Sequence, residues 1–190
     1  MKKKIAIIGS TGSIGKTLIN IIEKNKKNFE IKLLTANKDY KSLFKQAKKF
    51  KVKNLIITDL NSFKTFKKYN KNFDIKIYNN FDCLEKIFKK KIDYTMSSIT
   101  GILGLEPTIK MIKFTKKIAI ANKESIICGW NIINKELKKN KTKFIPVDSE
   151  HFSLWFGLKN LNPSNVEKFI LTASGGPLYK TPLNNFKKIK

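Results

Sequence analysis

Short apolar runs alternate with longer amphipathic segments along most of the chain. The short runs are typical of buried strands, and the longer segments repeat their apolar residues at helical spacing. The runs predict strands over residues 4–8, 31–36, 54–58, 74–78, 93–97, 117–121, 143–147 and 166–172. The amphipathic segments predict helices over residues 14–25, 40–50, 62–69, 81–90, 105–114, 124–139 and 150–158.

This alternation also predicts the fold class. Strands separated by helices form βαβ units, whose strands lie parallel in one sheet with helices on both faces. The first six or seven strands therefore predict an α/β fold with a doubly wound, mostly parallel, Rossmann-like sheet. We expect residues 1–150 to form this domain and residues 151–190 to begin a second, α+β domain. The boundary is placed from the strand count and from the positions of the motifs.

A glycine-rich turn follows the first predicted strand. Residues 9–15 read GSTGSIG, and a helix begins within them. Glycines at such a turn let the backbone approach a pyrophosphate closely, and the start of the helix supplies N–H groups and a positive dipole end. The motif predicts a dinucleotide site, with a tight turn packed by glycine as the structural alternative.

The end of the second predicted strand bears on which dinucleotide is bound. NAD-binding sites place an acidic residue there to hold the ribose hydroxyls. Here residues 35–39 read TANKD, so a neutral and a basic residue come first. Lys38 can pair with a 2′-phosphate, which favours NADPH over NADH, although Asp39 can also contact a ribose hydroxyl. Alternatively, Lys38 is one of many solvated lysines.

Three further segments place polar groups at the ends of predicted strands. Residues 121–125, ANKES, form either an active-site edge or a helix start capped by Asn122. Residues 172–177, TASGGP, can present N–H groups and a hydroxyl to a phosphate, or form an ordinary turn closed by proline. Asp148 and Glu150 follow the run 143–147 and suit a hard cation such as Mg²⁺ or Mn²⁺. The alternative is a helix start capped by Asp148 or Ser149.

Composition changes this picture little. The chain has 190 residues, a hydrophobic content of 41% and a formal net charge of +26, a charge that normally suggests an anionic partner. All forty basic residues are lysines, and they are dispersed. Nucleic-acid readers depend on arginine for bidentate contacts, so we do not expect nucleic acid as the main partner.

Targeting signals and cysteines favour a reducing, cytoplasmic location. The first apolar run stops at Gly9, too early for a signal peptide, and no run is long enough to span a membrane. Cys83 and Cys128 are far apart and form no CxxC motif, which argues against a disulfide framework or a zinc site.

Taken together, GSTGSIG, ANKES, the segment PVDSEH at residues 146–151 and the segment SGGP at residues 174–177 closely resemble 1-deoxy-D-xylulose 5-phosphate reductoisomerases. The resemblance covers the whole chain. It implies an NADPH-dependent oxidoreductase and isomerase that also needs Mn²⁺, Mg²⁺ or Co²⁺. Such an enzyme converts 1-deoxy-D-xylulose 5-phosphate to 2-C-methyl-D-erythritol 4-phosphate in isoprenoid biosynthesis. It also implies a bacterial, cytoplasmic protein that is a homodimer when full length, with a small sugar phosphate as substrate.

The resemblance also implies roles for individual residues. NADPH contacts fall on Thr11, Gly12, Ser13, Ile14, Asn37, Lys38, Asp39, Asn122 and Glu124. Many family members have Gly and Asn where this chain has Asn37 and Asp39. Metal ligands fall on Asp148 and Glu150, and substrate contacts on Lys123, Ser149, Glu150 and Ser174, with Lys123 and Glu150 as catalytic residues. His151 is part of the motif, and we expect it to pack rather than to act as a base.

Family members continue well beyond a length of 190 residues. Their further part is expected to carry a third acidic metal ligand and a flexible loop that closes over the substrate. Three hypotheses therefore stand for this chain. It is the amino-terminal portion of a reductoisomerase, a remnant or fragment that binds NADPH without turnover, or a basic nucleic-acid-binding module.

Overall fold

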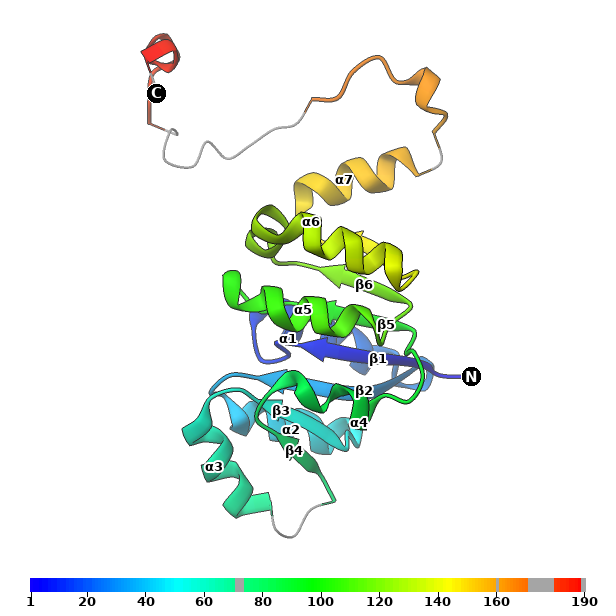
Figure 1. Cartoon of the computed structure of the whole chain (residues 1–190), viewed down its shortest axis with the longest axis vertical. Helices are drawn as coiled ribbons and strands as arrows, with labels where there is room; N and C mark the ends of the chain where they lie inside the picture. Colours follow the sequence, from blue (N-terminus) through cyan, green and yellow to red (C-terminus); the bar gives the residue numbers. More distant parts are fainter. Residues whose placement is uncertain (71–73, 160, 171–179, 189–190) are drawn as a thin grey trace. The chain divides into compact units, whose positions relative to one another are not determined.

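The computed structural model describes residues 1–70, 74–159, 161–170 and 180–188, and its centre is one parallel sheet. The sheet has seven strands in the order β4-β3-β2-β1-β5-β6-β7, and every neighbouring pair is parallel (Figure 1). The strands are β1 (Lys3–Ile8), β2 (Phe29–Ala36), β3 (Asn54–Ile57), β4 (Lys76–Tyr78), β5 (Tyr94–Ser97), β6 (Lys117–Ile120) and β7 (Lys143–Pro146). The predicted doubly wound α/β fold is confirmed.

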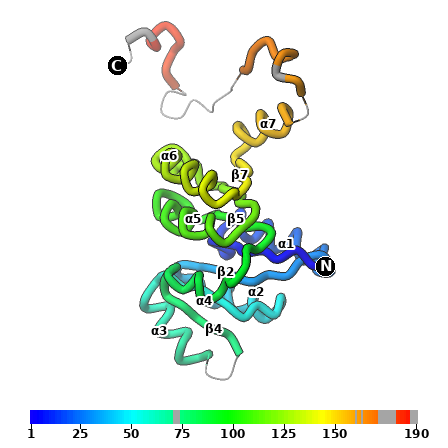
Figure 2. Tube along the Cα trace, turned by 45° about the vertical axis from the view of Figure 1, so that its right-hand side comes forward, coloured from blue at the N-terminus to red at the C-terminus, as the bar shows by residue number. Residues whose placement is uncertain are grey.

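Helices cover both faces of this sheet. The helices are α1 (Ser13–Lys24), α2 (Tyr40–Phe50), α3 (Leu60–Tyr69), α4 (Leu84–Ile87), α5 (Leu105–Ile112), α6 (Lys123–Lys139) and α7 (Ser149–Leu158). Short 3₁₀ turns lie at Lys26–Asn28, Phe81–Cys83, Ile102–Gly104, Pro163–Asn165 and Leu183–Lys188. The turned view separates α1 and α2 on one side of the strands from α4, α5 and α6 on the other (Figure 2).

The central strand shows why the apolar runs are continuous rather than alternating. Successive side chains of a strand point to opposite faces of the sheet. Ile5 and Ile7 therefore pack in the core under α1 and α2, whereas Ala6 and Ile8 pack in the core under α4, α5 and α6. Both faces exclude water over Ile5–Ile8, so all four of these buried positions of β1 are apolar, as in parallel sheets generally.

The order of the strands defines a switch point. Strand β1 pairs with β2 on one side and with β5 on the other, because the chain crosses back over the sheet after β4. The connections on the two sides of β1 run in opposite directions, which leaves a crevice between the carboxyl ends of β1 and β5. Open α/β sheets bind their ligands in such a crevice.

Two sequence predictions differ from the structure. The helix predicted over residues 81–90 is a 3₁₀ turn followed by α4, which ends at Ile87. There Phe88 takes an extended conformation and buries its ring 5.8 Å from that of Phe114. The strand predicted over residues 166–172 is wrong for residues 166–170, which form no ladder. Residues with high β propensity form a strand only where a neighbouring strand is available for pairing and packing.

The chain divides into two compact units, Met1–Val147 and Asp148–Lys190. The first unit contains the sheet and the helices α1 to α6. In the second unit, α7 has no buried residue, and the ring of Phe152 lies 5.8 Å from that of Trp155 and 5.7 Å from that of Phe156. The domain boundary that we expect at residue 150 stays a prediction, as does the α+β character of the second domain. No helix in the described part of the chain has the length and apolar character needed to cross a bilayer.

Candidate functional site

A cavity of about 560 Å³ opens at the switch point of the sheet. Its walls come from the turn after β1, from the ends of β2 and β3, and from the loops after β4 and β5. The polar residues that line it are Thr11, Thr35, Asn37, Thr58, Asn79, Asn80, Ser98, Thr100 and Glu106. The others are Gly9, Gly12, Ala36, Phe81, Ile99, Leu103 and Pro107. The cavity therefore lies where the fold predicts a ligand.

The glycine turn is held rigidly at the mouth of this cavity. Gly9 has a φ of 82°, and its N–H donates to Thr35 Oγ1 at 2.8 Å. The Ser10 hydroxyl donates to Gln46 Oε1 at 2.7 Å, and the Ser98 hydroxyl lies 3.3 Å from the Gly9 carbonyl. A Cβ on Gly9 would lie 3.0 Å from the Ser98 backbone, so this position needs glycine for conformation and for space. The turn is preorganised by its neighbours on β2, on α2 and directly after β5.

No side chain of the described residues caps the start of α1, which leaves its first N–H groups without a capping acceptor. Its N-cap is Gly12, which offers no side chain, and its first turn contains no acidic residue. The helices α2, α3 and α7 instead begin with an Asp whose side chain accepts a backbone N–H. Ser13 and Ile14, the other predicted phosphate-loop residues, form the first turn of α1. The unpaired N–H groups and positive end of a helix stabilise an anion.

The predicted cofactor residues at the end of β2 lie beside the cavity. The Asn37 side chain lines it and donates to Thr58 Oγ1 at 2.8 Å. Lys38 is exposed and follows directly, and its charge helps to lower the pKa of Asp59, after the larger effect of the hydrogen bonds from Ser62. A cation is thus placed next to a cavity wall.

Asp39, which the sequence left open as a ribose contact, is the N-cap of α2. Its carboxylate accepts the N–H of Ser42 at 3.0 Å. Burial alone would raise the pKa of Asp39, but the hydrogen bonds from Ser42 outweigh it and hold that pKa below its ordinary value. The helix therefore uses one oxygen of this carboxylate.

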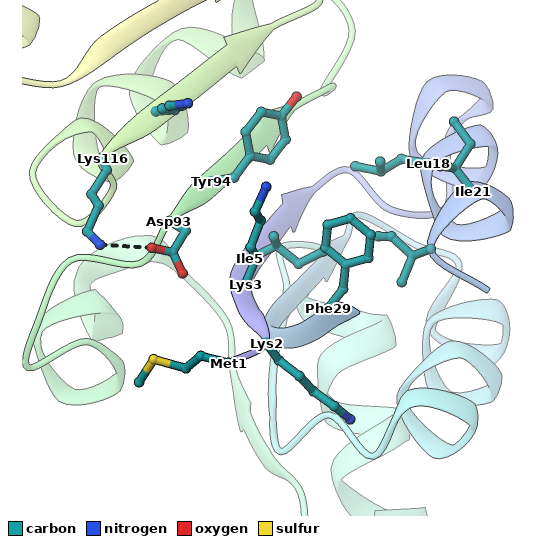
Figure 3. A pocket seen from close by; sticks show the side chains of 12 residues that line it. Met1, Lys2, Lys3, Ile5, Leu18, Ile21, Phe29, Asp93, Tyr94 and Lys116 are labelled. Atoms are coloured by element: carbon teal, nitrogen blue, oxygen red, sulfur yellow. Dashed lines mark hydrogen bonds and ion pairs between the residues drawn. The ribbon is translucent and has the colours of Figure 1, made fainter. Parts of the chain in front are cut away.

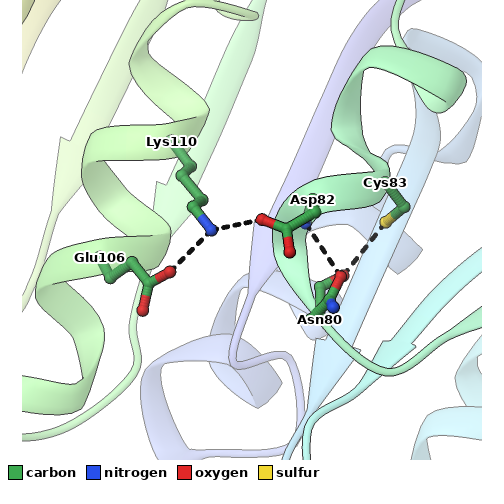
Figure 4. Close-up of polar contacts among 5 residues, drawn as sticks. All are labelled: Asn80, Asp82, Cys83, Glu106 and Lys110. Carbon is green, nitrogen blue, oxygen red and sulfur yellow. Dashed lines mark hydrogen bonds and ion pairs between the residues drawn. The ribbon is translucent and has the colours of Figure 1, made fainter.

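An ion-pair network beside the cavity joins Asp82, Glu106 and Lys110 (Figure 4). The Lys110 ammonium of α5 lies 2.6 Å from the Asp82 carboxylate and 2.7 Å from the Glu106 carboxylate, and both pairs raise the pKa of Lys110. The Asn80 side chain accepts the N–H of Asp82 at 3.0 Å. Because Asn80 and Glu106 both line the cavity, the network fixes the loop after β4 against α5. Next to it, burial raises the pKa of the Cys83 thiol to about 11, so this thiol stays protonated and unreactive.

The start of α6 lies at the same edge of the sheet, because β6 is parallel to β1 and β5. Asn122 is its N-cap and accepts the N–H of Ser125 at 2.9 Å. Its amide nitrogen donates to the carbonyls of Ile99 and Gly101. Lys123 and Glu124 follow in the first turn of the helix and are exposed. The capped helix start, one of the two sequence interpretations of ANKES, is confirmed as local structure.

Asp148 is the N-cap of α7 in the second unit, and its two carboxylate oxygens differ. Oδ1 accepts the N–H of His151 at 3.0 Å and lies 2.5 Å from Nδ1 of the same residue. Oδ2 is buried and has no hydrogen-bond partner within the described structure. Burial alone would raise the pKa of Asp148, but the hydrogen bonds from His151 outweigh it and lower that pKa. An ionised, buried and unpartnered oxygen is the kind of group that a cation satisfies.

The residues that follow Asp148 do not form a complete set of metal ligands within the described structure. The Ser149 hydroxyl donates to Glu150 Oε2 at 2.9 Å, so the two side chains are neighbours. His151 is 59% exposed, which makes the expected packing role wrong; its ring instead pairs with Asp148. Within the described ranges, no three acidic, His or Cys side chains gather in a way that could hold a metal ion. Ser174 lies outside the described residues.

A second cavity, of about 520 Å³, lies at the opposite, amino-terminal edge of the strands (Figure 3). Its floor is apolar, with Ile5, Leu18 and Phe29, and its rim carries the ion pair between Asp93 and Lys116 at 2.8 Å. None of the predicted site residues that the structure describes lines it. In the first unit, those residues all follow the carboxyl ends of strands.

Sequence reasoning missed the wall that β5 contributes to the first cavity. Ser98, Ile99 and Thr100 follow β5 directly and line the cavity, as does Thr58 after β3. The switch-point rule would have found them if the neighbour of β1 had been known. The chain shows no local motif there, because β5 becomes the neighbour of β1 only when the sheet assembles.

The strand order, the parallel sheet and the glycine turn at the switch point define a Rossmann-like α/β fold. A family model described as 1-deoxy-D-xylulose 5-phosphate reductoisomerase matches residues 5–129, and one for the C-terminal domain of that reductoisomerase matches residues 144–190. The chain belongs to the 1-deoxy-D-xylulose 5-phosphate reductoisomerase family.

Individual relatives agree with this assignment. The 1-deoxy-D-xylulose 5-phosphate reductoisomerase of Pelagibacter ubique is 60% identical over 189 residues, a match that covers 98% of this chain and 49% of the relative. The Zymomonas mobilis enzyme, solved in complex with NADPH, is 30% identical with a TM-score of 0.81, covering 100% of this chain and 50% of that one. A DOX-P reductoisomerase solved with NADPH, fosmidomycin and magnesium is 27% identical with a TM-score of 0.72, covering 78% and 37%. The chain spans about half the length of the curated relatives it matches.

Proposed function

We propose that this chain is the NADPH- and metal-binding portion of a reductoisomerase that converts 1-deoxy-D-xylulose 5-phosphate to 2-C-methyl-D-erythritol 4-phosphate. The observation that carries the proposal is the cavity at the switch point, which the glycine turn and the open end of α1 border together. Membership of the family and the NADPH in the solved Zymomonas mobilis relative support it.

NADPH fits the groups at this cavity. The turn over residues 9–12 brings backbone close to a pyrophosphate, and the first N–H groups of α1 can stabilise its charge. Lys38 lies beyond the end of β2, where the 2′-phosphate of NADPH belongs. Asn37 lines the same wall. The remaining proposed contacts, by family resemblance, are Thr11, Gly12, Ser13, Ile14, Asp39, Asn122 and Glu124.

A divalent cation, Mg²⁺ or Mn²⁺, fits Asp148. Its unpartnered Oδ2 offers the hard oxygen that such cations prefer, and Glu150 supplies a second carboxylate in the same segment. When bound, the cation polarises a carbonyl oxygen of the substrate. Ser149 and Glu150 are proposed to contact the sugar phosphate, Lys123 and Glu150 to take part in the chemistry, and Ser174 to hold the phosphate end.

A second candidate is a chain that binds NADPH without turnover. It is favoured by the donor set of the described residues, in which two acidic side chains are short of the six or so oxygen ligands that a hard cation takes. Nucleic-acid binding has no comparable support, because the lysines are dispersed, whereas a cavity of about 560 Å³ has the size of a small-molecule site. By family resemblance we further propose a cytoplasmic enzyme whose full-length form is a homodimer.

A titration separates these candidates. The purified chain is titrated with NADPH, and NADPH consumption is then followed with 1-deoxy-D-xylulose 5-phosphate and Mn²⁺. Binding with turnover supports the complete activity, and binding without turnover supports the second candidate. Absence of NADPH binding contradicts both, and steeply salt-dependent binding to DNA would instead support a basic nucleic-acid-binding module.

A further inference from the structure

The side chain of Asn122 is fully engaged within the protein. It is 3% exposed, and its Oδ1 accepts the N–H of Ser125 at 2.9 Å. Its Nδ2 donates to the carbonyl of Ile99 at 2.5 Å and to that of Gly101. An amide nitrogen has two hydrogens to donate, so both are used. The side chain therefore has little capacity left to bind a ligand directly.

One of the two carbonyls that it holds belongs to Ile99 in the wall of the cavity, and the other belongs to Gly101, two residues further on. Ile99 and the neighbouring Thr100 line the cavity, and Gly101 turns the chain with a φ of 70° immediately after them. Asn122 itself is not among the described residues that line the cavity. Its amide thus links the start of α6 to the loop after β5, and the loop in turn forms the surface that a ligand meets.

Capping alone does not explain an asparagine here. An N-cap needs only an acceptor oxygen, and the chain uses Asp39, Asp59 and Asp148 for that purpose at α2, α3 and α7. An aspartate at the start of α6 would cap the helix equally well. Only an amide can also donate to the two loop carbonyls, so the second function explains the choice of side chain.

Gly104 provides the space for this contact. A Cβ on Gly104 would lie 2.5 Å from the Asn122 amide nitrogen and 2.7 Å from the Ile99 carbonyl oxygen. Its φ of −77° and ψ of −15° are open to any residue, so conformation does not require glycine there. We call the two hydrogen bonds from the Asn122 amide to the carbonyls of Ile99 and Gly101 the clamp. Glycine is needed at position 104 because the clamp occupies the space where a side chain would be.

We propose that Asn122 is a positioning residue for the cofactor. Its side-chain amide holds Ile99–Gly101 in the conformation that NADPH meets, and this role replaces the direct contact of that side chain that the family resemblance implies. Because the loop is ordered during folding, binding does not have to bear the cost of ordering it. This proposal rests on the proposed NADPH site and refines the role of one of its residues.

Three variants test the proposal. Asn122→Asp keeps the cap but turns a carboxylate oxygen toward two carbonyl oxygens, which opens the clamp. Gly104→Ala opens it from the other side without altering Asn122. Thr142→Val is the matched control: Thr142 is 6% exposed, and its hydroxyl lies 2.9 Å from the carbonyl oxygen of Ile112 and 2.8 Å from that of Thr115, at the amino-terminal edge of the sheet.

Two readouts are taken for each variant. Amide hydrogen exchange of residues 98–104 is measured on the cofactor-free chain, and the dissociation constant for NADPH is measured by titration. We expect both clamp variants to exchange faster over residues 98–104 and to bind NADPH about tenfold more weakly, the effect of losing roughly one net hydrogen bond. Thr142→Val should lose comparable thermal stability but change neither readout.

The possible failures are distinct. Unchanged exchange over residues 98–104 in both clamp variants overturns the clamp. Faster exchange with wild-type NADPH affinity overturns the positioning role, and weaker NADPH binding with unchanged exchange indicates a direct contact instead. If the wild-type chain binds no NADPH, the proposed function fails, and hydrogen exchange alone then decides whether the clamp exists.

Discussion

The helices α1 and α6 begin at the same edge of the sheet, but their first turns are built in opposite ways. Gly12 at the start of α1 offers no capping side chain, and the N–H groups beside it border a cavity. Asn122 at the start of α6 is buried, and its side chain is hydrogen-bonded to Ser125, Ile99 and Gly101. The difference teaches that two helix starts at one edge can be used in two ways: an uncapped start is available to an anion, and a start capped by Asn122 is tied to the loop beside it.

The largest effect is expected from a side chain placed between α1 and the glycine turn, at Gly15. A Cβ on Gly15 would lie 2.6 Å from the Ser10 Cα, so Gly15→Ala must push α1 away from the glycine turn. Overpacking against backbone should destabilise the chain by about 3 kcal/mol. The displaced helix start should also abolish measurable NADPH binding. Urea unfolding and an NADPH titration measure the two effects.

The matched control for this variant is Gly157→Ala in α7. No atom of the described residues lies within 4 Å of a Cβ there, so the same change should be neutral or slightly stabilising, because alanine favours a helix. If Gly15→Ala were as well tolerated as Gly157→Ala, the close approach of α1 to the turn would have no energetic importance.

Asp148 extends the comparison to a capped end that keeps one oxygen unpartnered. Asp148→Asn retains an acceptor for the His151 N–H but removes the charge that a cation needs. We expect the affinity for Mn²⁺ to fall on the order of a hundredfold, with NADPH affinity close to that of the wild type. Electron paramagnetic resonance of free Mn²⁺ measures the first quantity. Equal losses of Mn²⁺ and NADPH binding would contradict the assignment of Asp148 to a separate metal site.

A smaller effect is expected from replacing Lys38, the exposed cation next to the cavity wall at Asn37. Lys38→Met should weaken NADPH binding about tenfold and leave NADH binding unchanged, because only NADPH carries the 2′-phosphate. Lys41→Met is the control, since Lys41 is another exposed lysine, in the first turn of α2. Parallel titrations with the two dinucleotides measure the discrimination. Equal losses for NADPH and NADH, or the same loss in Lys41→Met, would remove Lys38 from the 2′-phosphate site.

The smallest effect is the pH dependence of the capped ends. Hydrogen bonds from Ser62 lower the pKa of the Asp59 cap of α3 below its ordinary value. The stabilisation that ionised Asp59 contributes is therefore complete above the ordinary pKa of an aspartate and is lost as the pH falls through the lowered value. Asn at this position caps without titrating.

The melting temperatures of wild type and Asp59→Asn, measured between pH 7 and pH 3, test this. The melting temperature of the wild type relative to Asp59→Asn should fall as the pH drops over the acid end of this range. A difference that is constant with pH would show that ionisation of Asp59 contributes nothing to stability.

The local features of the fold could be predicted from the sequence. Apolar runs such as residues 4–8 and 117–121 gave strands to within a residue or two, because burial on both faces demands them. The carboxyl-edge position of the glycine turn and of Asn122 followed from the parallel sheet. The run 166–172 failed over its described part, because apolar character alone does not supply a partner strand.

The assembled features of the site could not be predicted. The wall at Ser98–Thr100 exists because β5 pairs with β1, a choice made by the packing of the whole sheet. The Asn122 amide uses both of its hydrogens on carbonyls about twenty residues earlier in the chain. These hydrogen bonds also depend on the absence of a side chain at Gly104. Sequence reasoning found the residue and could not show which of its atoms are already in use.

The central claim is that NADPH binds at the carboxyl edge of the sheet, against the open end of α1 and the loop after β5. The most direct measurement is an NMR titration of the isotope-labelled chain with NADPH, followed through its backbone amide shifts. We predict the largest shifts at Gly12–Ile14 and at Ile99–Gly101, with the amides around the amino-edge cavity, such as Lys3 and Tyr94, unchanged. Shifts confined to the amino edge, or no shifts at NADPH concentrations that saturate the solved relatives, would contradict the account.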